Sequence, residues 1–538
     1  MSRKFLSLLI TFMLAFGGCY FPSKKTKLVN IETLEKEKEI TTPSKVYLND
    51  GTIVLFQKGF RVENNQITGI GRGYYLNNQF DQEMKNFSIP LENVATLTYH
   101  KVKAEGGSAL GSVIMGITAV PLTALAVYCL INPKACFGSC PTVYVKENGQ
   151  YQFCSELFSY SISPYMEADD LDLLIGNLDQ TKNPLDIRIT NEALETHFIN
   201  EMRLIQVTHP KNTAVYPTSG NQLLLFDEFH PPEEAKNSRG VDVLSQIAKS
   251  DQVGYRSPDD LVLELKKGAY FDFLDLKVKV PASIPSVKLL LKVRNTLLST
   301  ILFYEVVLAS QGIDALSWIE KINTDPAYAN LFQSVYHTFS GITIKVKKVN
   351  EWVAIEKIND VGPIAYKYVA AILPTYNQEE LQIRLEFIPD NFIFDGIFFD
   401  YGNEEDEKNL FTEVLDCETI FDCEGQERKD LMKLLREKDD LYLVTEPSDV
   451  YHLFYQLRNE SEDEAISLFV RSRGYYTEWL RGKWITEKST PNYKFDLYDF
   501  AGIFNQLVDS WLGSKKMMEE AFYKTRIPIR EEKCPEYR

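Results

Sequence analysis

The chain has 538 residues, of which 44% are hydrophobic and 12% aromatic, and its formal net charge is −17. This composition excludes an intrinsically disordered protein, and the length suggests roughly three or four domains. The acidic balance argues against nucleic acid as a partner and against docking on anionic lipid by charge. The 29 tyrosines and 32 phenylalanines favour strands over helices, so we expect a β-rich chain.

The N-terminus has the features of a signal peptide. Two basic residues at positions 3 and 4 precede an apolar run over residues 5–16, and two glycines stand directly before Cys19. We therefore expect residues 1–18 to be a signal peptide. It is either a lipoprotein signal, in which Cys19 becomes lipidated, or an ordinary secretory signal beside an incidental cysteine.

The small residues before Cys19 resemble the lipobox of bacterial lipoproteins, although Phe16 stands where leucine is usual. The resemblance implies cleavage after Gly18 and attachment of diacylglycerol and a further acyl chain, such as palmitate, to Cys19. Several acyl chains on one cysteine exceed the single chain that gives only marginal membrane binding. The expected location is the cell envelope, lipid-anchored, in the outer membrane of a Gram-negative bacterium.

The first folded domain is expected after a polar tether over residues 19–43. Residues 44–104 alternate strand-like runs with the turn sequences NDG at 49–51 and NN at 64–65. Short strands at this spacing predict a small curled sheet that looks like an SH3-type barrel. Small barrels more often serve as adaptors than as catalysts.

An uncharged stretch follows over residues 106–133, so we expect a hydrophobic helical segment at 105–133. It is long enough to span a membrane, and Gly107 and Gly111 form a GxxxG pattern that permits close helix contact. Pro121 lies in its middle and can split it into two short helices. Two interpretations stay open: a membrane span, or a helical hairpin that is buried in the protein or dips into one leaflet.

The segment CFGSCPTVYVKENGQYQFCSELFSYSI resembles an uncharacterised family of small β-domains in bacterial envelope proteins, with the pattern Cys-Phe-Gly-x-Cys-Pro-x-Tyr. The matching residues, with one extra residue before the tyrosine, are Cys136, Phe137, Gly138, Cys140, Pro141 and Tyr144. The resemblance covers about 30 residues, and the family has no known activity.

Cysteines in an oxidising compartment favour a structural disulfide between Cys136 and Cys140. A redox pair would need a thiol pKa depressed by a basic neighbour or a helix N-terminus. A zinc site would need a fourth ligand besides these two and Cys154. Cys417 and Cys423 are close enough in sequence to form a second disulfide.

The rest of the chain is expected to be an α+β, β-rich arrangement of several domains: a β-sandwich-like middle and a mixed helix-sheet C-terminal part. Helical periodicity runs from Leu297 to Leu308 and stops at Gly312. The predicted ranges are a β-sandwich-like domain at 134–282, a helix-plus-sheet domain at 283–402, a charged helical connector at 403–440 and an α/β segment at 441–538.

Two further groups of residues suggest sites. Glu192, Glu195 and His197 have the residue types of metal ligands but not the helical spacing, so we expect a hydrogen-bond network at a strand end. A basic-aromatic patch begins near Arg471 and is either a binding surface for an acidic or glycan partner or a buried structural helix. Its binding candidates are Arg473, Tyr475, Tyr476, Trp479, Arg481 and Trp484.

The sequence shows no nucleophile elbow, phosphate loop or paired-carboxylate hydrolase signature, so we predict no catalytic residue, no metal and no cofactor. Two functional hypotheses stand. The first is a non-enzymatic envelope lipoprotein that presents β-rich domains to a protein or a surface polymer, with the membrane as a further partner. The second is an envelope hydrolase or thiol-redox enzyme whose residues meet only in the folded protein.

Overall fold

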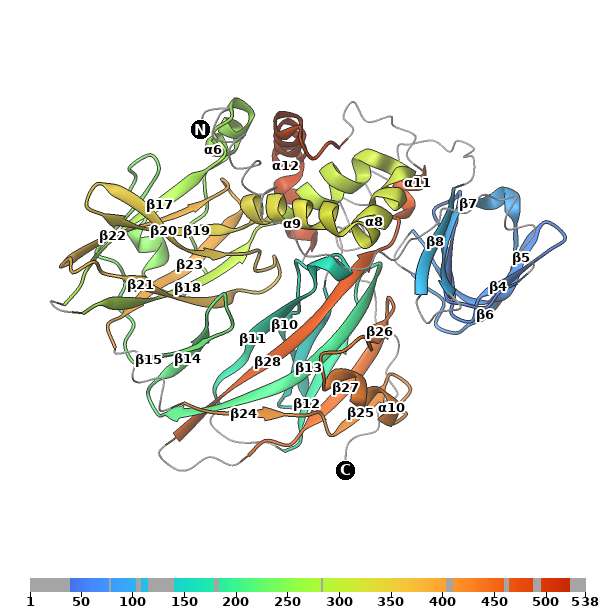
Figure 1. Ribbon diagram of the computed structural model, residues 1–538, viewed down its shortest axis with the longest axis horizontal. Coiled ribbons are helices and arrows are strands. Elements are labelled where there is room, and N and C mark those ends of the chain that lie inside the picture. Colours follow the sequence, from blue (N-terminus) through green and yellow to red (C-terminus); the bar gives the residue numbers. More distant parts are fainter. Residues whose placement is uncertain are drawn as a thin grey trace.

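The computed structural model shows a β-rich protein with several separate sheets, which confirms the predicted β-rich α+β fold of several domains. Figure 1 shows a small sheet at one end, two larger groups of sheets beside it, and helices along one side of those groups. The described residues are 39–76, 79–102, 108–114, 140–178, 183–281, 284–402, 410–458, 464–486 and 495–522.

The small N-terminal sheet is a nearly closed barrel of eight strands in the order β1-β4-β5-β3-β2-β7-β8, with β6 paired to β5. Its core contains Val46, Val54, Phe56 and Leu97, none of which is exposed. The strands are β1 (Glu39–Ile40), β2 (Ser44–Leu48), β3 (Ile53–Phe56), β4 (Phe60–Glu63), β5 (Gln66–Tyr74), β6 (Lys85–Pro90), β7 (Val94–Val102) and β8 (Ser108–Ile114).

The predicted turn at 64–65 is confirmed. Asn64 and Asn65 have φ values of 51° and 62° and join β4 to β5. Positive φ at both central residues is the conformation of the hairpin turn whose twist matches the flanking strands, and asparagine tolerates it better than most residues.

The predicted helix over residues 105–133 is wrong at its start, because residues 108–114 form β8, which pairs antiparallel with β7. Pairing with the edge of an incomplete barrel supplies backbone hydrogen bonds that outweigh the local preference of a small-residue run. Gly111 therefore lies on a strand, whereas Gly107, Pro121 and the rest of the stretch lie outside the described residues. Among the described residues, no helix is long and apolar enough to cross a membrane.

The first sandwich consists of two five-stranded sheets built from two distant parts of the chain. One sheet has the order β10-β9-β12-β27-β25, and the other has the order β11-β28-β13-β24 with β26 paired to β13. The strands are β9 (Thr142–Glu147), β10 (Gln150–Glu156), β11 (Ala168–Leu178), β12 (Leu185–Thr190), β13 (Glu195–Pro210), β24 (Phe411–Leu415), β25 (Thr419–Asp422), β26 (Leu443–Thr445), β27 (Val450–Tyr455) and β28 (Glu464–Glu478).

The predicted boundaries at 134–282, 403–440 and 441–538 are therefore wrong. The long pairing of β13 with β28 joins Glu195 to Glu478 at one end and Pro210 to Glu464 at the other. The predicted helical connector instead supplies two strands and only short helical turns. Local periodicity does not show pairings between residues more than 250 positions apart, so contiguous domains were the natural expectation.

The second sandwich is inserted between these two parts and packs two sheets over one core (Figure 1). The larger sheet contains β16 (Glu234–Asn237), β17 (Asp272–Lys279), β22 (Glu380–Phe387), β19 (Ile342–Lys348) and β20 (Glu351–Ile358). The smaller contains β21 (Lys367–Pro374), β18 (Ser286–Asn295) and β23 (Phe392–Asp400), and its outer face packs against the hairpin β14 (Ala214–Pro217) and β15 (Leu223–Phe226).

Two longer helical stretches lie beside the sandwiches. The predicted helical run is confirmed: residues 298–308 are helical, and Gly312, at φ 57°, kinks the chain before the next helix. The α-helices are α5 (Leu244–Ile247), α6 (Asp259–Glu264), α7 (Leu298–Ile301), α8 (Ala315–Thr324), α9 (Pro326–Ser340), α10 (Lys429–Met432), α11 (Gly482–Thr486) and α12 (Phe500–Phe522). A π-helix (Leu302–Leu308) follows α7, and 3-10 turns occupy Leu91–Asn93, Pro164–Met166, Leu265–Lys267, Ala309–Asp314 and Lys433–Leu435.

The C-terminal helix α12 is joined to the second sandwich through one buried carboxylate. Asp390 is fully buried and accepts a hydrogen bond of 2.8 Å from Trp511 Nε1 on α12. Its other ion pairs are with Lys515, also on α12, at 2.8 Å, and with Arg256. Because two cations and an indole share this carboxylate, its burial is compensated.

The end of β28 joins the barrel, the first sandwich and the π-helix. Trp479 is fully buried, packs edge-on against Tyr74 of the barrel at 5.2 Å, and lies 4.5 Å from the Lys45 ammonium. Its indole N–H donates to Thr196 Oγ1 over 2.8 Å, and Lys45 donates to the same oxygen over 2.7 Å. Burial lowers the pKa of Lys45, against the opposing effect of the Glu446 carboxylate.

Arg481 lies beside Trp479, and its guanidinium lies between two buried carboxylates. Its guanidinium donates to Glu478 over 2.7 Å and lies 3.9 Å from Glu195. Tyr304 of the π-helix donates to Glu195 over 3.1 Å and also to Glu478. Burial, and then the neighbouring Glu195 charge, raise the pKa of Glu478 well above its usual value.

Replacing Arg481 with methionine should strongly destabilise the protein, because it removes the cation facing two buried carboxylates. We expect the free energy of unfolding, measured by urea denaturation, to fall by about 3–5 kcal/mol. The control is Arg61→Met, which removes an ion pair with Glu39 in which both side chains are at least half exposed. That variant should unfold almost as the wild type does, because exposed pairs are screened by water. Equal effects of the two variants would contradict the assignment.

Candidate functional site

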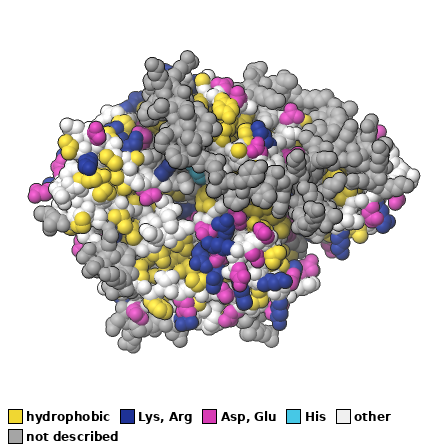
Figure 2. All heavy atoms as spheres, viewed as in Figure 1, with side chains coloured by type: hydrophobic (Ala, Val, Ile, Leu, Met, Phe, Trp, Pro, Cys, Tyr) yellow, Lys and Arg dark blue, Asp and Glu magenta, His cyan; other side chains and the backbone are white. Residues whose placement is uncertain are grey.

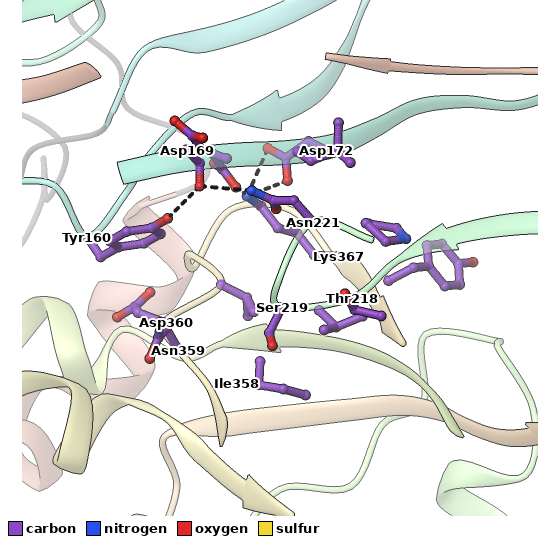
Figure 3. Close-up of a pocket in the computed structure, with 16 residues that line it drawn as sticks. Tyr160, Asp169, Asp172, Thr218, Ser219, Asn221, Ile358, Asn359, Asp360 and Lys367 are labelled. Carbon is purple, nitrogen blue, oxygen red and sulfur yellow. Dashed lines mark hydrogen bonds and ion pairs between the residues drawn. The ribbon is translucent and has the colours of Figure 1, made fainter. Parts of the chain in front are cut away.

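A small polar pocket lies where the two sandwiches meet, and its cavity has a volume of about 70 Å³. Its walls come from β11, from the turn between β14 and β15, and from residues 358–361 together with the start of β21 (Figure 3). The side chains that matter chemically are Tyr160, Asp170, Asp172, Asn221, Asp360 and Lys367. The inserted sandwich therefore creates the pocket, since neither sandwich has all of these groups.

Lys367, the first residue of β21, reaches across to the carboxylates of β11. Its ammonium lies 2.7 Å from Asp172 and 3.6 Å from Asp170, and it donates to the Glu156 carbonyl oxygen over 3.2 Å. Asp170 and Asp172 lie two residues apart on one strand, so both face the same side of the sheet. In Figure 3 Lys367 points directly at Asp172. This ion pair connects the two sandwiches.

The pKa values around Lys367 follow from its two carboxylate neighbours. Burial alone would lower the pKa of Lys367, but Asp170 and Asp172 raise it above its ordinary value, so the side chain stays charged. Burial, and then repulsion from Asp170, raise the pKa of Asp172 to about 6, even though Lys367 and Ser155 act to lower it. One ammonium shared between two carboxylates compensates only part of their desolvation.

A second group of charges surrounds Asp169 at the edge of the same pocket. Arg473 of β28 donates to Asp169 over 3.0 Å, and Lys438 also forms an ion pair with it. Although partial burial acts to raise the pKa of Asp169, hydrogen bonds from Lys438 and Arg473 lower it below its usual value. Asn221, on the turn after β14, donates to the Asp169 carbonyl oxygen over 3.3 Å and closes this side of the pocket.

Asp360 forms the inner wall of the pocket. Its carboxyl group accepts hydrogen bonds from Tyr336 of α9 over 3.1 Å and from the Gly362 N–H over 2.8 Å. Burial raises its pKa above the ordinary value, despite these two donors. Behind it lies a small internal cavity that Asp360 lines together with Cys140 and Tyr304.

The basic-aromatic patch is largely internal, so four of its members fit the buried structural interpretation rather than the binding surface. Tyr476, Trp479, Arg481 and Trp484 are at most 5% exposed. The reason is the alternation of β28, whose inward-facing residues enter the core, together with the turn after it, which packs against the barrel. A buried arginine needs carboxylate partners, and Arg481 has them in Glu478 and Glu195.

The other two members of the patch face outward from β28. Tyr475 stacks on Phe198 of β13 with ring centres 4.6 Å apart, and Arg473 is paired with acidic groups of β11. Arg471 on the same face pairs with Glu201 at 2.6 Å. Figure 2 shows Lys and Arg side chains mixed with Asp and Glu over the middle of this face. The surface is therefore a compensated mixture of charges rather than a basic patch.

No disulfide joins two described cysteines. The predicted bridge between Cys417 and Cys423 is therefore wrong: both are buried side chains in the first sandwich. Cys140 is also buried, with a free thiol, whereas its expected partner Cys136 lies outside the described residues. Burial raises the pKa of the Cys417 thiol to about 12 and that of Cys154 to about 11, which disfavours the reactive thiolate.

The predicted hydrogen-bond network at residues 192–197 is confirmed. His197 and Glu195 of β13 interact over 3.2 Å, and Tyr144 donates to Glu192 over 2.6 Å. Within the described residues, no cluster of three or more His, Cys, Asp or Glu side chains has the geometry to hold a metal ion.

The sequence interpretation did not identify the Lys367 pocket. A signal for one half is present in the sequence, because an Asp-x-Asp pair at 170 and 172 places two carboxylates on one face wherever the segment forms a strand. The other half had no local signal, since Lys367 lies almost 200 residues later on a different sandwich.

The chain matches no known protein family and no curated protein. A GH31 α-xylosidase from Xanthomonas citri aligns with 8% identity and a TM-score of 0.17, over 77% of this chain and 37% of the xylosidase. A protein of Sulfolobus Turreted Icosahedral Virus aligns with 8% identity and a TM-score of 0.11, over 63% of this chain and 89% of the viral chain. TM-scores this low show no shared fold, so neither likeness bears on function.

The raised pKa of Asp172 predicts a pH dependence of stability. In the folded protein Asp172 keeps its proton up to about pH 6, whereas in the unfolded chain it loses it near pH 4. Its stabilising contribution is therefore present below pH 4 and is lost as the pH rises through 6. We expect the free energy of unfolding of the wild type to decline more steeply between pH 4 and 6.5 than that of Asp172→Asn.

The matched control is Asp169→Asn on the same strand, which removes a carboxyl group whose pKa is lowered. The pH dependence of the contribution of Asp169 to folding stability is opposite to that of Asp172: the contribution is present above pH 4 and is lost as the pH falls. Denaturant unfolding at a series of pH values measures both slopes. If Asp172→Asn leaves the pH profile unchanged, the raised pKa is refuted.

Proposed function

We propose that the protein is a lipid-anchored, non-enzymatic protein of the cell envelope, in the outer membrane of a Gram-negative bacterium, that binds a protein or surface-polymer partner through the Lys367 pocket. The anchor in this proposal is Cys19, on the strength of the signal-like N-terminus and the glycine pair before it. The barrel begins about 20 residues after Cys19, so the tether would hold it near the bilayer.

One observation carries the binding proposal: most charged groups of the pocket already have a partner of opposite charge within the protein. Lys367 forms ion pairs with both carboxylates on β11, and Arg473 and Lys438 pair with Asp169. Polar groups that make hydrogen bonds, such as Ser219 and Asn221, line the mouth. Such a pocket favours orienting a polar ligand by hydrogen bonds over supplying a charged catalytic group.

One observation favours the hydrolase alternative: Asp172 and Asp360 are two carboxyl groups with raised pKa values in a single pocket. The thiol-redox alternative is less well supported, because burial raises the pKa of Cys140, Cys154 and Cys417. If the protein is a hydrolase, incubation with isolated envelope polymer should release fragments, and Asp172→Asn should abolish that release.

Lipidation at Cys19 has a direct test. Cys19→Ser should move the full-length protein from the membrane fraction to the soluble fraction, because the acyl chains that hold it would be missing. Cell fractionation followed by a carbonate wash measures the distribution. A Cys19→Ser variant that stays in the washed membranes would show that another segment anchors the protein.

The role of the pocket is tested at its rim. Asn221 has φ 62°, so Asn221→Gly removes the side chain without straining the backbone. The control is Asn212→Gly at φ 70° on the exposed turn before β14, which does not line the pocket. Losing one hydrogen-bonding side chain should weaken capture of the partner from crosslinked envelopes about fivefold or more. Equal capture by Asn221→Gly and Asn212→Gly would rule out the pocket as the binding site.

A further inference from the structure

A row of partly exposed aromatic side chains begins inside the Lys367 pocket. Tyr368 of β21 lines the pocket and also packs on Tyr216 of β14, with ring centres 4.9 Å apart. Thr218, two residues after Tyr216, lines the pocket as well and bridges to Ala370 of β21. The wall of the pocket is therefore continuous with the outer surface of the hairpin and of the smaller sheet.

The row continues away from the pocket. Tyr216 lies 6.3 Å from Phe229, and Phe229 lies 6.1 Å from Phe398 of β23, both in edge-to-face contact. We call Tyr368, Tyr216, Phe229 and Phe398 the aromatic row. Phe229 is 42% exposed although a buried phenylalanine, Phe226, stacks beneath it at 6.0 Å. The four rings form a contiguous, partly exposed apolar surface, and contiguous apolar surface is a feature of binding sites.

Two buried carboxylates near the aromatic row, Asp395 and Asp400, have partners within the protein. Lys292 of β18 contacts Asp395 at 2.6 Å and lies 5.8 Å from the Tyr368 ring. Asp400 accepts hydrogen bonds from the Asp227 and Gly402 N–H groups, at 2.8 and 2.6 Å. The pocket has the same compensated character. A ligand that spans both surfaces therefore meets hydrogen-bonding groups and aromatic rings.

We propose that the occupant is a neutral glycan chain, whose first sugar unit places hydroxyl groups in the Lys367 pocket and whose following units lie on the aromatic row. A pyranose ring has an apolar C–H face that packs on an aromatic ring and a hydroxyl edge that makes hydrogen bonds, so it matches both parts of the surface. An acidic chain would be repelled by Asp227 and Glu228, which are exposed beside Phe229. This inference rests on the proposed binding function and identifies its partner as a surface polymer.

The test measures how affinity depends on chain length. The full-length protein in detergent is titrated with neutral oligosaccharides of two and six units, from glucose, mannose, galactose and N-acetylglucosamine series, by calorimetry. The wild type should bind the hexamer of at least one series. Phe229→Ala should weaken hexamer binding about tenfold and disaccharide binding less than twofold, because only the longer chain reaches that ring.

Two further variants make the outcomes separable. Phe411→Ala removes another exposed phenylalanine, 62% exposed on β24 of the first sandwich, and should leave both affinities unchanged. Asn221→Gly should weaken both ligands alike, since the pocket serves the first sugar. All three variants should have melting temperatures near that of the wild type, because the replaced side chains are substantially exposed or lie on a turn.

The result that overturns the inference is distinct from the failure of the proposed function. If Phe229→Ala weakens both lengths alike or neither, the aromatic row does not bind the chain. If no oligosaccharide binds but envelope capture still depends on Asn221, the pocket serves a partner other than a neutral glycan. If neither binding nor capture depends on Asn221, the proposed binding function fails as well.

Discussion

The architecture depends on how the protein compensates the buried charges at the end of β28. Glu195, Glu478 and Arg481 are almost completely inaccessible to water, and they belong to two strands and to the turn that follows them. Desolvating three charges is unfavourable unless each has partners, so the π-helix must supply Tyr304 at this point and the strands must keep their register. Trp479, between Glu478 and Arg481, then fixes where the barrel packs. The turn after β28 thereby determines how the barrel, the first sandwich and the helices pack against one another.

A second compensated contact of the same kind relates the two sandwiches. Lys367 comes from the inserted sandwich, and Asp170 and Asp172 come from the first, so any separation of the two would leave buried carboxylates without their cation. Asp390 has the corresponding role for α12, with Arg256 and Lys515 as partners. Each such contact is worth little as a net gain over apolar packing, but breaking it is costly, which favours one arrangement of the parts over others.

The parts of the fold that were predictable from the sequence are those set by neighbouring residues. The turn at Asn64-Asn65, the helical run before Gly312 and the strand-end network at His197 follow from local spacing and residue type, and the structure has all three. What the sequence could not show is the pairing of β13 with β28 across the whole inserted sandwich, because strand pairing at that separation leaves no periodic trace. The burial of the basic-aromatic patch could not be decided from the sequence for the same reason, since its partners Tyr74 and Thr196 lie hundreds of residues away. The Lys367 pocket was missed because its lysine and carboxylates meet only in three dimensions.

The insertion explains why a pocket exists at this place. A closed sandwich buries its inner faces and offers a flat outer one, so a concave site needs a second body placed against it. Here the hairpin β14–β15 leaves the first sandwich, covers part of the smaller sheet, and brings Thr218 and Asn221 up to β11. The same hairpin sets Tyr216 against Tyr368, so the element that closes the pocket also starts the aromatic row. Because one hairpin builds both surfaces, a ligand that uses them together needs no movement of the two sandwiches, and its affinity should depend on the number of units that reach the row.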